Sequence, residues 1–201
     1  MRFTKIVRHW IWVAPLVLGV IFVAAGIYTY LEGRDAKNTV HDQIVAEQIT
    51  TAEDSAIPGV LVDDADTAQA QADAIQKHTL TSTGGKTYSQ LERFVSADGQ
   101  GTTNDAKAAL IGADGKPVAN PLRNTAFQGA ALRTALNEAV IGFKLSDLVM
   151  GIGVFMLVIG GTFIVFIAPA VYYSAEVANH YEELIKREKK EAPGTGTVMP
   201  A

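Results

Sequence analysis

A stretch of 28 residues without a charged side chain, residues 148–175, most strongly constrains how this chain can fold. As an α-helix it would be about 42 Å long, whereas the hydrocarbon core of a bilayer is about 30 Å thick. The helix is therefore long enough to cross a membrane and to emerge from it. A second uncharged stretch of 22 residues, residues 10–31, would be about 33 Å long. The sequence thus predicts two membrane spans.

The first span has an alternative interpretation as a cleaved secretory signal, because basic residues precede it and Ala24 and Ala25 could provide a cleavage site. Its apolar run is, however, longer than the roughly 7 to 15 residues of such signals. Tryptophans at its start and tyrosines near its end also suit the aromatic belts at the two surfaces of a membrane. We therefore expect an uncleaved anchor.

Basic residues lie on the terminal side of each span. Arg2, Lys5 and Arg8 precede the first span, and four lysine or arginine residues follow the second within residues 186–190. By the positive-inside rule, both termini are cytoplasmic and residues 32–147 are extracytoplasmic, with the chain in the inner (plasma) membrane. The predicted parts are a cytoplasmic N-terminus (1–9), two transmembrane helices (10–31 and 148–173), an extracytoplasmic domain (32–147), a charged cytoplasmic helix (174–191) and a disordered tail (192–201).

The segment between the spans is acidic. Residues 32–147 carry ten lysine or arginine residues against sixteen aspartate or glutamate residues, a net charge of −6. Such a domain is unsuited to nucleic acids, whose phosphates need a basic surface. The chain has no cysteine, which excludes disulfides, thiolate metal sites and cysteine nucleophiles. The expected fold class is a mainly α membrane protein with two antiparallel transmembrane helices and a mostly helical extracytoplasmic domain between them.

Apolar residues recur at helical spacing on both sides of a short break in the acidic domain. Between residues 35 and 52 this spacing predicts that the first span continues as a helical stalk, ended by Pro58 and Gly59. Residues 60–62 could form a short strand. Residues 65–80 are rich in Ala and Gln, and predict a surface helix capped by Asp66 or Thr67.

Two short motifs are similar to ligand-binding loops. Residues 84–87, Gly-Gly-Lys-Thr, match the end of a phosphate-binding loop, but Leu80 stands where that loop requires a glycine. We expect a turn there and no nucleotide. The aspartates within residues 63–66 suggest calcium, but the alternating oxygen ligands and terminal Glu of a calcium loop are missing. We expect a solvated helix start.

The next segments predict small elements. Thr87 and Gln90 have the spacing of a capping box, which predicts a short helix with Tyr88 and Leu91 buried. The Asp-Gly pair at residues 114–115 predicts a type I′ hairpin turn in a short ribbon.

From residue 121 onward an apolar stripe runs towards the second span. Its large members are Phe127, Leu132, Leu136, Val140 and Phe143. They are expected to form the core against which the stalk and the middle helix pack. The alternative is that they form a surface for a partner.

Glycines recur at two turns of helix in both spans. Gly19 and Gly26 are seven residues apart, as are Gly153 and Gly160. A column of small residues lets two helix backbones approach closely, which is how helices associate in lipid. We expect these four glycines to pack the spans together as an antiparallel hairpin. Glycine is also common in spans generally, so an unrelated role remains the alternative.

The sequence contains no catalytic constellation that we can assemble. Of the four histidines, only His41 and His78 lie in the predicted outer domain, and a metal would also need a carboxylate beside them. Neither span contains an ionisable residue, so neither resembles an ion or proton pathway. We expect no cofactor, no metal and no enzymatic activity.

Two stretches, residues 65–91 and 124–160, are similar to a family of small actinobacterial membrane proteins with two spans. The matching features are the Gln-Ala-rich helix, the Thr-Gly-Gly-Lys-Thr-Tyr turn, the Ala-Leu-rich helix and the Leu-Val-Met-Gly-x-Gly-Val opening of the last span. The cytoplasmic extension and the loop near residues 99–114 depart from the family pattern. Members are often labelled aromatic ring-opening dioxygenases, a label that the missing iron ligands argue against here.

These observations favour a non-enzymatic accessory or assembly subunit of a larger actinobacterial envelope or respiratory complex. Its expected partners are membrane lipids and other membrane protein subunits. The alternative is an extracytoplasmic module that binds a lipid or small ligand in a groove lined by residues 127–143. An enzyme is the third hypothesis, and would need His41 and His78 beside one carboxylate.

Overall fold

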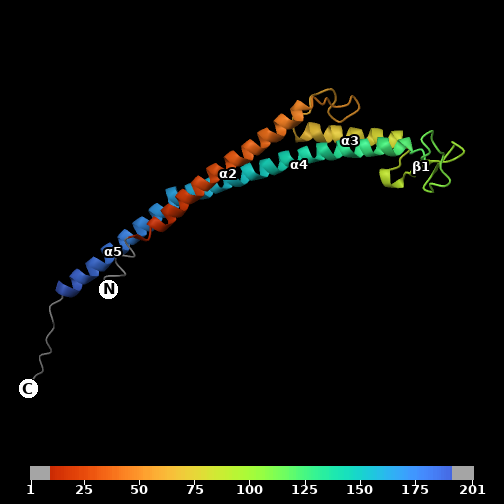
Figure 1. The fold of residues 1–201 in the computed structure, drawn as a ribbon. Helices are drawn as coiled ribbons and strands as arrows, with labels where there is room; N and C mark the ends of the chain where they lie inside the picture. The colour runs from red at the N-terminus through yellow and green to blue at the C-terminus, as the bar shows by residue number, and fades with distance from the viewer. Residues whose placement is uncertain (1–9, 192–201) are drawn as a thin grey trace, which may run out of the picture. The chain divides into compact units, whose positions relative to one another are not determined.

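The computed structural model describes residues 10–191 and is mainly helical, with 70% of the chain in helices (Figure 1). The predictions for the N-terminus (1–9) and the tail (192–201) concern residues outside this described part. The elements in chain order are α2 (Val13–Ala46), α3 (Ala65–Ser82), η1 (Tyr88–Gln90), β1 (Phe94–Val95), β2 (Thr102–Thr103), α4 (Pro121–Thr162), η2 (Phe163–Ile167) and α5 (Ala168–Glu191).

The described residues form two compact units, one from residues 10–32 and 149–191 and the other from residues 33–148. Two helices are long and apolar enough to cross a membrane, Val13–Ala46 and the continuous helical run Pro121–Lys190. Only 11% of the most apolar window of each is buried, so neither is the enclosed core helix of a soluble domain. The prediction of two long apolar helices is confirmed.

Proline commonly interrupts a helix, which predicts a break at Pro169, but the second apolar helix continues through this residue. Immediately before it, η2 is a turn of π-helix, and the Ala168 N–H donates to the carbonyl of Phe163, five residues back. Proline has no N–H, and in a regular α-helix its ring collides with the carbonyl four residues earlier. The wider π turn lets the chain pass this position and enter α5 without ending. The expected break was therefore wrong.

The stalk is helical, but it ends at Ala46 and not at Pro58. The N–H of Gln48 donates to the carbonyl of Val45 at 3.0 Å, and Gln48 has a left-handed backbone with φ of 52°. These features tighten and then end the last turn. The strand expected at residues 60–62 is a single bridge, between Thr50 and Leu61.

The N-cap of α3 is Asp64, and not Asp66 or Thr67 as predicted. Its carboxylate accepts a hydrogen bond from the Thr67 N–H at 2.8 Å, and the Asp64 N–H donates to the Thr67 hydroxyl at 3.1 Å. This reciprocal pair is a capping box. The carboxylate satisfies a helix donor, so this acidic segment has a structural role.

The capping box predicted at Thr87 is confirmed, with the Thr87 N–H donating to the Gln90 side chain at 2.9 Å. Leu91 is buried as expected, but Tyr88 is exposed. The guanidinium of Arg123 lies 3.9 Å from the centre of the Tyr88 ring, which holds the ring at the surface in a cation–π contact.

Residues 94–119 form a small ribbon around β1 and β2, which pair antiparallel with Phe94 opposite Thr103. The turn near its end is not type I′, because Gly115 has φ of 74° whereas Asp114 does not have a positive φ. The Gly115 N–H donates to the carbonyl of Gly112 at 3.0 Å. A turn followed by one left-handed glycine suits a longer hairpin loop with a bulge.

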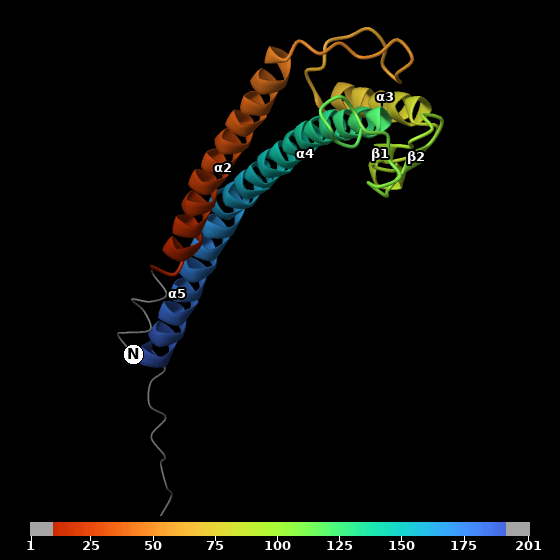
Figure 2. The same ribbon diagram turned by 45° about the vertical axis from the view of Figure 1, so that its right-hand side comes forward.

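The core of the 33–148 unit brings together α2, α3 and α4. In Figures 1 and 2, α3 lies along the first part of α4, with β1 near the start of that helix. The buried cluster contains Ile44, Val62, Ala68, Ala72, Leu136, Val140 and Phe143. The alanines of α3 allow close helix packing, and the larger residues of α4 fill the space between the helices.

Candidate functional site

The four glycines predicted to pack the spans are brought together in two pairs within the 10–32 and 149–191 unit. A methyl group on Gly19 would lie 2.9 Å from the carbonyl oxygen of Gly160. One on Gly26 would lie 2.8 Å from the carbonyl oxygen of Gly153. The Cβ atoms of real side chains rarely come within 3.4 Å of such neighbours. Neither position therefore has room for a side chain larger than that of glycine.

The neighbouring glycines do not take part in these contacts. A methyl group on Gly151 or Gly161 would meet nothing within 4 Å. The glycines spaced seven residues apart are therefore the ones that lie in the helix contact, whereas Gly151 and Gly161 lie outside it. In the same unit, the rings of Trp12 and Tyr172 meet edge to face, with centroids 5.8 Å apart.

The apolar stripe does not act as one surface. Leu136, Val140 and Phe143 are buried in the core cluster. Phe127 and Leu132 are 60% and 57% exposed. The ring of Phe127 packs beside that of Tyr88, with centroids 6.3 Å apart. The expected core therefore accounts for three of the five residues.

Another set of apolar residues on α4 is exposed, and the sequence reasoning missed it. Ile141, Leu145 and Leu148 are 64%, 57% and 59% exposed, and their spacing places them on one face of the helix. Ile141 and Leu145 lie just before the uncharged stretch, Leu148 is its first residue, and Lys144 and Asp147 stand between them in the sequence. Because these charged residues interrupt the apolar spacing, the sequence did not indicate an apolar helix face here. We call these three residues the α4 apolar face.

The other side of this part of α4 contacts α2. The ammonium of Lys37 and the carboxylate of Asp147 form an ion pair of 2.7 Å. A methyl group on Gly142 would lie 2.9 Å from a side-chain carbon of Val40. These contacts fix the part of α4 that carries the α4 apolar face.

The histidines of the acidic domain pair separately. His41 lies 3.2 Å from the carboxylate of Asp42, and His78 lies 2.8 Å from that of Asp54. The Lys77 ammonium also contacts Asp54 at 2.7 Å, and hydrogen bonds from Lys77 and His78 hold the pKa of Asp54 below its usual value. Within residues 10–191, no three His, Cys, Asp or Glu side chains gather as metal ligands.

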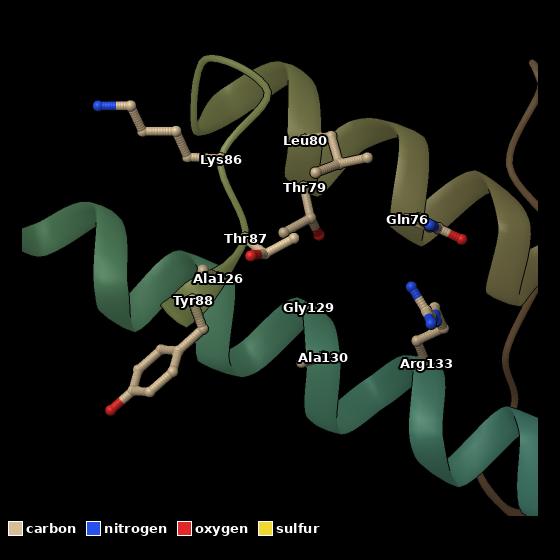
Figure 3. A pocket seen from close by; sticks show the side chains of 10 residues that line it. All are labelled: Gln76, Thr79, Leu80, Lys86, Thr87, Tyr88, Ala126, Gly129, Ala130 and Arg133. Carbon is tan, nitrogen blue, oxygen red and sulfur yellow. The ribbon is translucent and has the colours of Figure 1, made fainter. Parts of the chain in front are cut away.

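A small hollow between α3 and α4 contains a different group of polar side chains (Figure 3). Its volume is about 90 Å³. Its lining residues are Gln76, Thr79, Leu80, Lys86, Thr87, Tyr88, Ala126, Gly129, Ala130 and Arg133. Figure 3 shows the guanidinium of Arg133 directed towards Gln76 and the Lys86 ammonium turned away. Gly129, a glycine in an Ala-Leu-rich helix, was the one sequence sign of a close approach here.

Comparison of the chain with protein-family models, with curated proteins and with solved structures finds no match.

Proposed function

We propose that the protein is a non-enzymatic, two-span membrane protein that acts as an accessory or assembly subunit of a larger actinobacterial envelope or respiratory complex. In this proposal the spans are antiparallel, both termini are cytoplasmic and residues 32–147 lie outside the inner membrane. The pairing of Gly19 with Gly160 and of Gly26 with Gly153 supports an antiparallel hairpin. The basic residues at both ends of the chain support its orientation.

The observation that carries the proposal is the α4 apolar face. Exposed large apolar residues that are grouped on one helix face commonly mark a contact with another protein. Ile141 and Leu145 lie just before the second span and Leu148 is its first residue. The neighbouring Lys144 and Asp147 indicate the water boundary. A helix of another membrane subunit, packed against α4 at the membrane surface, would bury the α4 apolar face.

The alternative, a groove for a lipid or small ligand lined by residues 127–143, has less support. Leu136, Val140 and Phe143 are occupied by contacts with the core cluster. A ligand groove requires a concave apolar space with a few convergent polar groups. These three large members of the stripe are therefore not free to line a groove for a ligand.

The test is site-specific photo-crosslinking in native membranes. A photoreactive amino acid replaces Ile141 or Leu145, and Lys116, an exposed residue of the distal turn, receives it as the control. We expect the first two positions to give one discrete adduct with an integral membrane protein, and Lys116 to give none. A chain that forms no adduct at Ile141 or Leu145 would overturn the proposal. An adduct with a second copy of this chain would replace it with self-association.

A further inference from the structure

We propose that the hollow between α3 and α4 binds a small oxyanion, a carboxylate or phosphate group, through the guanidinium of Arg133. The inference does not rest on the proposed function, because every residue of the hollow belongs to the 33–148 unit.

The hollow is built by three segments that the fold holds in place. Thr79 from α3 contacts Gly129 of α4 so closely that any larger residue at Gly129 would collide with its side chain. The linking segment returns to α4 because Gly84 and Gly85 both have positive φ, and the Gly85 N–H donates to the carbonyl of Leu80 at 2.7 Å. The Arg123 contact then fixes Tyr88 at the edge of the hollow.

Three polar side chains that line the hollow lack partners among the described residues, whereas the hydroxyl of Thr87 is bonded to the Gln90 side chain at 3.0 Å. Arg133 is half-buried, and within residues 10–191 its guanidinium makes no hydrogen bond or ion pair. The same holds for the side chains of Gln76 and Thr79. By contrast, two lysines of this acidic unit, Lys37 and Lys77, are paired with aspartates. A bound anion would give this partly buried guanidinium the charge-assisted hydrogen bonds that no described protein group provides.

The lining selects the charge and size of the ligand. The groups available to a ligand are the Arg133 guanidinium, the Thr79 hydroxyl and the Gln76 amide, because the Lys86 ammonium is turned away, and the lining has no Asp or Glu. Arginine presents its donors in a planar fork that matches a carboxylate or phosphate group. A volume of about 90 Å³ holds one such group and is well below the roughly 300 Å³ at which pockets that enclose larger ligands begin. The hollow therefore encloses one anionic group and not a whole nucleotide.

The direct experiment is a titration of the full chain in lipid-free detergent with inorganic phosphate, followed by phosphorus NMR line broadening, and with acetate, followed by saturation-transfer NMR. We expect saturable binding by the wild type, weakened at least about tenfold by Arg133→Gln. Ala130→Phe, which fills the hollow and keeps every charge, is expected to abolish binding. Lys144→Gln removes an exposed cation elsewhere on α4, and should bind as the wild type does.

The possible results test whether the site exists and whether its ligand is a lipid headgroup or a soluble anion. No saturable binding by the wild type, or binding that Arg133→Gln and Ala130→Phe leave unchanged while circular dichroism shows them folded, would overturn the inference. A second arm adds phosphatidate to phosphatidylcholine nanodiscs that hold the protein. Displacement of inorganic phosphate by phosphatidate would support the site with a lipid headgroup as its ligand, and unchanged phosphate binding would support it with a soluble anion.

Discussion

Replacing Gly160 with alanine is the sharpest perturbation of the packing between the apolar helices. The added methyl group would lie 2.7 Å from the carbonyl oxygen of Gly19 and 2.8 Å from the backbone nitrogen of Val23. Ordinary contact begins at 3.4 Å, so the backbones must separate by about 0.7 Å. Overpacking of this kind costs about 1–3 kcal/mol, because backbone atoms cannot turn aside as a flexible side chain can.

Gly161→Ala is the matched control, since its methyl group meets nothing within 4 Å. Both substitutions gain the same intrinsic helix propensity, which favours alanine over glycine by about 1 kcal/mol, so their difference isolates the contact. The assay is unfolding in mixed micelles of increasing dodecyl sulfate content. Trp12 fluorescence reports it, because this ring lies against Tyr172, and Trp10→Phe removes the other tryptophan. Equal unfolding free energies for the two variants would refute the glycine contact.

The remaining predictions concern the 33–148 unit. Phe143→Ala should lower the free energy of unfolding by about 3–5 kcal/mol, whereas the exposed Leu132→Ala should change it by less than about 0.5 kcal/mol, as measured by thermal denaturation. Equal effects would contradict the core assignment. Asp64→Ala should cost about 1 kcal/mol at neutral pH through loss of the cap, whereas its exposed neighbour Asp63→Ala should cost little. Hydrogen bonds from Thr67 lower the pKa of Asp64, so its stabilising effect is present above the ordinary pKa of about 4 and is lost as the pH falls through the lower folded value. A difference between wild type and Asp64→Ala that grows on acidification would contradict this sign.

The sequence predicts the regular elements well where the pattern is long. The uncharged stretches and the apolar periodicity lead directly to two long helices, and the Thr87 capping box is present as predicted. The sequence does not distinguish between neighbouring residues that could have the same structural role. Asp64 and Asp66 are both plausible helix caps, and only the hydrogen bond to Thr67 distinguishes them.

The features that were missed depend on residues far apart in the chain. The sequence predicts that Arg133 is a surface residue of a helix. It lines a hollow only because residues 84–88 pack back against that helix. The same applies to Phe127 and Leu132, which share the periodicity of Phe143 but lie beyond the core cluster. At Pro169 local preference predicted a break, but one π turn accommodates the proline.

The most direct measurement of the central claim is the accessibility of single cysteines in intact cells, because the chain has none of its own. Gln100→Cys places a thiol in the exposed part of the β1–β2 ribbon, and Glu188→Cys places one on the exposed surface of α5. A two-span protein with both termini in the cytoplasm predicts that a membrane-impermeant maleimide labels Gln100→Cys in intact cells. Glu188→Cys should be labelled only after the membrane is permeabilised. Labelling of both residues, of neither, or of Glu188→Cys alone in intact cells would contradict the proposed topology.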